Sequence, residues 1–62
     1  MLVLSRYVGE SILIDTDEGP VEVTVVAIKS NGAVRLGIRA PETMPVHRQE
    51  VYERIREDRK RD

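Results

Sequence analysis

The strongest constraint on this fold is the small hydrophobic core that 62 residues can form. A domain of this length buries only about 60% of the surface that its unfolded chain exposes, so it is marginally stable on its own. The sequence has no cysteine and one histidine, which excludes a disulfide framework and a Cys/His zinc site as sources of stability. Oligomerisation remains as a source of the missing stability. We therefore expect one small domain that forms a homodimer with a shared core.

The net charge of the chain and its distribution limit the kinds of molecule that the protein can bind. The formal net charge is -1 and the pI is about 5.8, whereas nucleic-acid-binding domains usually carry a basic surplus. The charge is uneven, however, because residues 33–48 hold three arginines and only one acidic residue: Arg35, Arg39, Arg48 and Glu42. Any anion-binding site is therefore expected to be local and to use few arginines.

Neither a membrane span nor a signal peptide is visible in the sequence. No apolar run approaches the roughly 18 residues that a transmembrane helix needs. The first residues, Met-Leu-Val-Leu-Ser-Arg, lack the charged and long apolar regions of a signal peptide. We expect a cytoplasmic protein without membrane contact.

Alternating apolar residues separated by turn signals predict a mainly β fold with five short strands. These strands are expected at residues 1–7, 11–14, 21–29, 34–40 and 43–46. Gly9 indicates a bend between the first two strands, and Asn31-Gly32 indicates a hairpin between the third and fourth. Gly37 suggests that another backbone approaches closely. Pro45 favours an edge position for the fifth strand.

Residues 15–20, Asp-Thr-Asp-Glu-Gly-Pro, are predicted to form an exposed acidic loop. The spacing of Asp15, Asp17 and Gly19 is only superficially that of a calcium loop, since the later glycine and the glutamate at the twelfth position are missing. A solvated loop is the favoured interpretation. We predict no metal and no cofactor.

One helix is predicted, over residues 47–58. No glycine or proline follows Pro45, and three apolar residues recur at helical spacing: Val51, Tyr52 and Ile55. Glu50 stands four residues before Arg54, which favours an ion pair on the helix surface. The predicted domain covers residues 1–58, and residues 59–62 are expected to form a charged, flexible tail.

His47 and Arg48 are placed where the last predicted strand passes into the helix. Free backbone N–H groups at a helix start, together with a cationic side chain, can bind an anion. An enzyme is not predicted, because there is no cysteine, no serine with a neighbouring base and no acidic partner for the histidine. Single-stranded RNA fits better, since backbone groups can read its unstacked bases while arginine contacts phosphate.

Three motifs follow one another in a characteristic order: Met-Leu-Val-Leu-Ser-Arg-Tyr-Val-Gly-Glu-Ser, Val-Arg-Leu-Gly-Ile-Arg-Ala-Pro and Val-His-Arg-Gln-Glu-Val-Tyr-Glu-Arg-Ile. Together they resemble the carbon storage regulator (CsrA/RsmA) family, from residue 1 to about residue 56. The resemblance implies five strands and a C-terminal helix in an intertwined homodimer that shares two sheets. It also implies recognition of GGA motifs in mRNA hairpin loops, which represses translation by covering the ribosome-binding site and modulates mRNA stability.

The resemblance implies an RNA-binding surface that two protomers build together. One protomer supplies Leu4 and Arg6 from its first strand. The other supplies Val46, His47 and Arg48 from its fifth strand and helix start. Arg48 matches the family arginine most closely tied to RNA binding. Sequestering small RNAs and a flagellar-assembly protein antagonist are further partners that the resemblance suggests.

The chain also departs from the family pattern. Tyr7 replaces a basic residue, Glu42 stands where lysine is common, and the loops at 15–20 and 30–33 are longer. These differences predict lower RNA affinity or an altered stem preference. Pro45 removes a backbone donor that relatives could use to read a base.

Two other functions are alternatives to RNA recognition. Binding of duplex DNA would need a denser basic face than these few arginines provide. The stronger alternative is a divergent member that acts as a protein-interaction module with weak or lost RNA binding.

Overall fold

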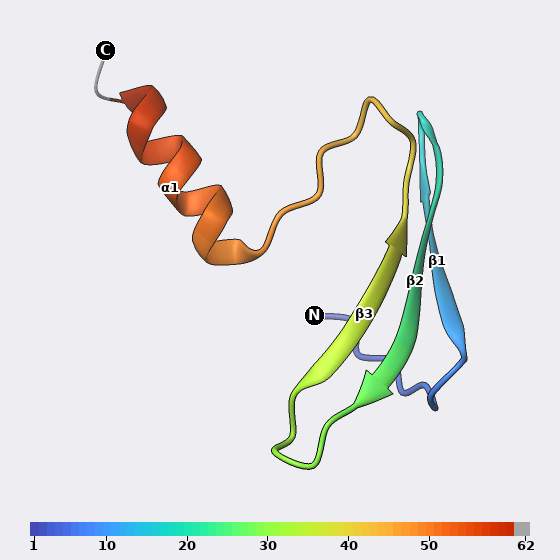
Figure 1. Ribbon diagram of the computed structural model, residues 1–62. Coiled ribbons are helices and arrows are strands. Elements are labelled where there is room, and N and C mark those ends of the chain that lie inside the picture. Colours follow the sequence, from blue (N-terminus) through green and yellow to red (C-terminus); the bar gives the residue numbers. More distant parts are fainter. Residues whose placement is uncertain (61–62) are drawn as a thin grey trace.

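The computed structural model describes residues 1–60 and contains one antiparallel sheet of three strands and one C-terminal helix (Figure 1). Strand β2 is central, with β1 and β3 at the edges. The elements are β1 (Ser11–Thr16), β2 (Gly19–Ile28), β3 (Val34–Arg39) and α1 (Gln49–Lys60). A mainly β fold with a C-terminal helix is therefore confirmed.

The hairpin between β1 and β2 is tighter than the sequence indicated. Asp15 pairs with Pro20 and Thr16 with Gly19, so only two residues lie outside the ladder. The Thr16 hydroxyl donates to the Gly19 carbonyl oxygen at 2.5 Å, and Gly19 has a φ of 121°. The prediction of a loop over residues 15–20 was therefore wrong in extent, because this glycine permits an immediate reversal of the chain.

The hairpin between β2 and β3 confirms the turn predicted from Asn31-Gly32. The Lys29 N–H donates to the Ala33 carbonyl oxygen at 2.8 Å, and the Gly32 N–H donates back to the Lys29 carbonyl oxygen at 3.0 Å. The Asn31 Oδ1 accepts the Ala33 N–H at 3.0 Å, and Gly32 has a φ of 92°. The side-chain amide and the glycine thus close the turn together.

The predicted bend at Gly9 is also confirmed, with a φ of 89°. The Gly9 N–H donates to the Val25 carbonyl oxygen at 2.8 Å, and the Val25 N–H donates to the Glu10 carbonyl oxygen at 3.1 Å. This bend therefore fixes the start of the chain to the central strand.

A β-bulge at Val26 explains why the alternation of β2 is lost after its middle. Val25 lies opposite Leu36 and Ala27 opposite Arg35, so Val26 is an extra residue. The extra residue reverses the alternation and brings Ile28 to the face that carries Val25. The close approach predicted at Gly37 is made by the Val26 side chain rather than by a backbone.

The sheet has one apolar face and one polar face. The apolar face carries Ile12, Ile14, Val21, Val23, Val25, Ile28, Val34, Leu36 and Ile38. The polar face carries Ser11, Glu22, Thr24, Arg35, Gly37 and Arg39. Val21, at 7% exposure, is the one buried hydrophobic residue of the described chain, while Leu36 remains 55% exposed. The apolar face is thus largely uncovered within one chain.

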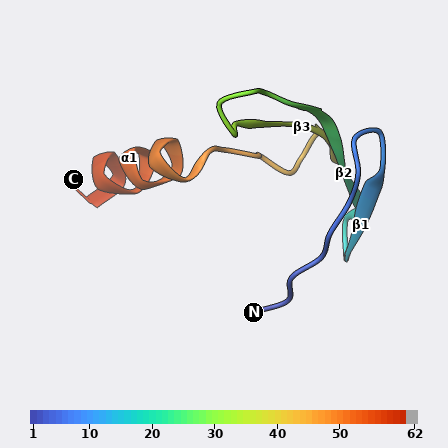
Figure 2. The same ribbon diagram turned by 90° about the horizontal axis from the view of Figure 1, so that it is seen from below.

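Helix α1 does not cover that face. Among the described residues it contacts no strand, and Figures 1 and 2 show it extending away from the sheet. It begins at Gln49 rather than His47 and continues to Lys60, two residues into the segment predicted as a tail. The remainder of that predicted tail, residues 61–62, lies outside the described residues. No helix in the described part is long and apolar enough to span a membrane.

The strands expected at residues 1–7 and 43–46 are not formed within the single chain described over residues 1–60. The Met44 N–H instead donates to the Pro41 carbonyl oxygen at 2.9 Å, which places the first part of the second segment in a turn. A strand exists only where a neighbour completes its hydrogen bonds, and neither segment has such a neighbour here. Five strands and the sharing of sheets therefore remain predictions about an assembly.

Candidate nucleic-acid interface

The N-terminal segment lies along the apolar face of the sheet. Leu4, Ser5 and Arg6 line an open hollow of about 400 Å³. The rest of its lining comes from the apolar face: Ile12, Val23, Val25 and Leu36. Two of the predicted RNA-binding residues, Leu4 and Arg6, thus border the uncovered apolar surface.

Arg6 is oriented by acceptors that are near it in the sequence. Its Nη2 lies 3.2 Å from Glu10 Oε2, and its Nε and Nη1 donate to the carbonyl oxygens of Ser5 and Ser11 at 3.3 and 3.5 Å. Glu10 Oε1 accepts the Tyr7 N–H at 2.8 Å. Glu10 therefore holds both the bend of the backbone and the Arg6 guanidinium.

The segment that precedes α1 lines a second hollow on the same face. Val46, His47 and Arg48 border an open space of about 450 Å³ opposite three residues of β3, namely Val34, Leu36 and Ile38. The prolines at positions 41 and 45 keep this segment from entering the helix earlier. All three residues predicted at the helix start are thereby gathered at one place.

Arg48 is the capping residue of α1. Its carbonyl oxygen accepts the Tyr52 N–H at 3.0 Å, the first hydrogen bond of the helix. Its guanidinium lies 2.5 Å from Glu50 Oε1, with the two side chains 83% and 58% exposed. Glu50 was predicted to pair with Arg54, but in the described residues its ion pair is with Arg48. Apart from this ion pair, the described residues give the Arg48 side chain no other polar partner, and its exposure leaves it open to a ligand.

The two groups of predicted site residues do not share one hollow. Leu4 and Arg6 line the first, whereas Val46 and Arg48 line the second. Leu36 borders both hollows, so both lie on the same face of the sheet. A single chain thus presents the predicted site as two half-sites rather than as one complete surface.

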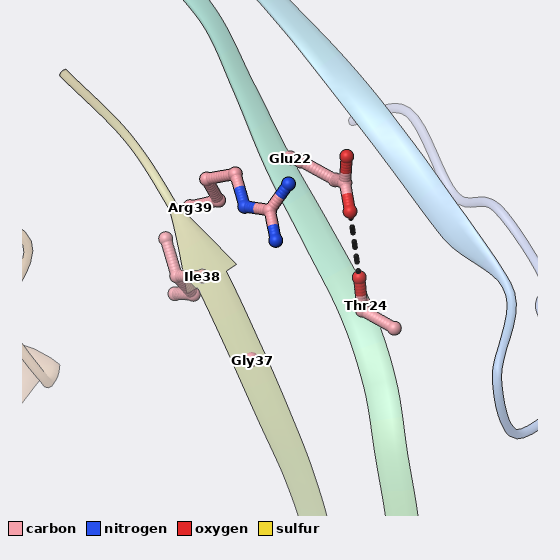
Figure 3. Close-up of a pocket in the computed structure, with 5 residues that line it drawn as sticks. All are labelled: Glu22, Thr24, Gly37, Ile38 and Arg39. Carbon is pink, nitrogen blue, oxygen red and sulfur yellow. Dashed lines mark hydrogen bonds between the residues drawn. The ribbon is translucent and has the colours of Figure 1, made fainter.

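A third, smaller hollow of about 200 Å³ lies on the polar face, lined by Glu22, Thr24, Gly37, Ile38 and Arg39 (Figure 3). The Thr24 hydroxyl donates to Glu22 Oε1 at 3.3 Å and pairs with the Ser11 hydroxyl at 2.7 Å. No motif in the sequence marks this hollow, although strand alternation places Glu22, Thr24 and Arg39 on one face. Within residues 1–60, no cluster of three or more His, Cys, Asp or Glu could hold a metal ion.

The family model described as the CsrA global regulator protein family matches residues 1–57. The chain belongs to this family. CsrA-family proteins are RNA-binding, post-transcriptional regulators, and this class of function applies to the chain. The match covers all five predicted RNA-binding residues and the start of α1. No solved structure matches the chain.

Proposed function

We propose that this CsrA-family protein is a translational regulator that binds GGA motifs in the hairpin loops of mRNA. It would act in the cytoplasm on 5' untranslated regions, where it covers the ribosome-binding site and alters mRNA stability. The observation that supports this most directly is the position of Arg6 and Arg48 at two open hollows of one apolar sheet face. Sequestering small RNAs and a flagellar-assembly protein are proposed as further partners.

The proposed RNA site belongs to a homodimer. The apolar face is largely uncovered by the described residues of one chain, and an exposed apolar face of this extent marks an interaction surface. Strands β1 and β3 each have a free edge. A second copy that supplied its residues 1–7 and 43–46 as additional strands would complete two sheets and bury the apolar faces between them.

Such an assembly would also unite the half-sites. Leu4 and Arg6 of one protomer would lie beside Val46, His47 and Arg48 of the other. Backbone N–H and C=O groups of the paired segments would read the base edges of the loop, and the two arginines would contact phosphate. With so few cations, the slope of log affinity against log salt should correspond to roughly two to four phosphate contacts.

A gel-shift experiment tests the proposal. The parent protein should retard a hairpin with GGA in its loop at much lower concentration than a hairpin with the same stem and a scrambled loop. The stem is held constant because duplex contacts contribute affinity without sequence preference. Equal affinity for the two hairpins would point to non-specific binding, overturn GGA recognition and favour the alternative functions.

A further inference from the structure

Both candidate RNA-binding arginines carry a carboxylate partner in the free protein. Arg6 is paired with Glu10, and Arg48 is paired with Glu50. The two partners differ in their other contacts. Glu10 also accepts the Tyr7 N–H at 2.8 Å and therefore supports the bend at Gly9. Glu50 makes only the ion pair with Arg48 among the described contacts, so its role is tied to that arginine.

The pairing of Arg48 with Glu50 is one of two that the helix permits. Arg54 stands four residues after Glu50, the spacing that usually stabilises a surface ion pair on a helix. The Glu50 carboxylate instead turns back toward the helix start, with its Oε1 2.5 Å from the Arg48 guanidinium. There it also lies near the positive end of the helix dipole, which favours a negative charge.

We propose that Glu50 competes with RNA phosphate for Arg48 and thereby lowers the affinity of the RNA site. The inference rests on the proposed function. Carboxylate and phosphate bind the same fork of N–H donors on a guanidinium. RNA that engages this fork therefore displaces Glu50, and the carboxylate left behind repels the incoming phosphate.

Because the Arg48–Glu50 pair is exposed, the strength of this competition should depend on the salt concentration. Both side chains are largely in water, where an ion pair contributes little stability and is screened by salt. Glu50 therefore lowers RNA affinity by a modest factor without closing the site. Its effect should be largest at low ionic strength and should fade as salt is added.

Replacement of Glu50 by Gln removes the competing charge and keeps the shape of the side chain. Glu50→Gln should bind the GGA hairpin about two- to fivefold more tightly than the parent at low salt. Glu53→Gln is the matched control, because Glu53 is on the same helix and its carboxylate contacts the Gln49 amide at 3.2 Å rather than an arginine. Glu53→Gln should raise the affinity for the GGA hairpin by a smaller factor. In an Arg48→Ala background, Glu50→Gln should raise this affinity by no more than Glu53→Gln does.

A second measurement tests the ion pair without RNA. Phenylglyoxal modifies unpaired guanidinium groups, and peptide mass spectrometry can follow its reaction at Arg48. Modification should be faster in Glu50→Gln than in the parent and unchanged in Glu53→Gln. Circular dichroism of each variant reports whether α1 is retained.

The outcomes separate the inference from the proposed function. If the parent binds GGA hairpins no more tightly than scrambled ones, the proposed function is wrong. The proposed competition between Glu50 and RNA is then wrong as well. If GGA preference holds but Glu50→Gln and Glu53→Gln give equal gains, or the gain persists without Arg48, only the competition is overturned. Unchanged modification of Arg48 in Glu50→Gln would likewise overturn the inference alone.

Discussion

A β-carbon added to Gly37 would lie 3.1 Å from Cγ2 of Val26. Val26 is the extra residue of the β2 bulge, so its side chain lies over the strand that carries Gly37. The bulge and the glycine are therefore one structural unit. The glycine leaves room for the Val26 side chain on the polar face, and the bulge keeps Ile28 on the apolar face.

The effect of Gly37→Ala on stability should consequently depend on which residue occupies position 26. In the parent, the new methyl group crowds a stiff valine, and the strain of about 1 kcal/mol offsets the gain from a less flexible unfolded chain. In a Val26→Ala background the crowding is gone, and Gly37→Ala should stabilise by about 0.4–1 kcal/mol. Thermal melting of the four proteins measures the coupling. Identical shifts in both backgrounds would show that the contact is not tight in solution.

The turn between β2 and β3 should depend on the positive φ of Gly32. Gly32→Ala forces a β-carbon into the left-handed region and should destabilise the protein by about 1–2 kcal/mol. Gly32→Asn is the matched control, because asparagine tolerates this region better, and its loss should be clearly smaller. Urea unfolding compares the three proteins. Equal losses for the two substitutions would mean that the turn adopts another conformation.

Assembly should depend on the apolar face and not on the polar one. Leu36→Asp places a charge on the uncovered apolar face, where dimer formation would bury it at a prohibitive cost, so this variant should sediment as a monomer or fail to fold. Leu13→Asp is the control, since Leu13 is 69% exposed in the other edge strand and is paired with Glu22 of the polar face. It should sediment at twice the chain mass, like the parent. A compact, stable parent monomer at micromolar concentration would exclude the dimer.

RNA binding and stability should separate at the helix start. A cation at the N-terminus of a helix is unfavourable to the helix dipole, so Arg48→Ala should leave the melting temperature nearly unchanged. The same substitution should remove a charge-assisted contact of about 1.5–3 kcal/mol and lower RNA affinity roughly tenfold to hundredfold per site.

Ile55→Ala provides the opposite case, because Ile55 is the half-buried member of the apolar stripe on α1. It should lower the melting temperature first, and RNA binding only as a consequence. Melting curves and gel shifts on both variants make the comparison. An Arg48→Ala protein that unfolds, or that retains full affinity for the GGA hairpin, would remove the helix start from the RNA site.

The elements that the sequence predicted correctly are those stabilised by contacts between near neighbours in the chain. The Asn31-Gly32 hairpin is closed by its own turn chemistry, and the hydrogen bonds of α1 join residues one helical turn apart. Residues 1–7 and 43–46 have the same alternation as true strands but no partner in their own chain. Alternation predicts which side chains of a strand share a face. It does not show whether a neighbouring strand is present to pair with it.

The candidate site also has one feature that the local sequence predicts and one that it does not. The gathering of His47 and Arg48 at the helix start followed from two prolines and the first helical residues. The pairing of Glu50 with Arg48 instead of Arg54 could not be read from spacing, because both arginines are within reach and exposed ion pairs differ little in free energy.

The order β1-β2-β3 has a consequence for how quickly the molecule assembles. Each strand pairs with the next one along the chain, so the sheet forms through local hairpins, a step that takes on the order of microseconds. Encounter between two such sheets is a second-order step. In refolding, an early phase should be independent of protein concentration, and a later phase should accelerate in proportion to it. Dilution alone would then set how long each chain exposes its apolar face after synthesis.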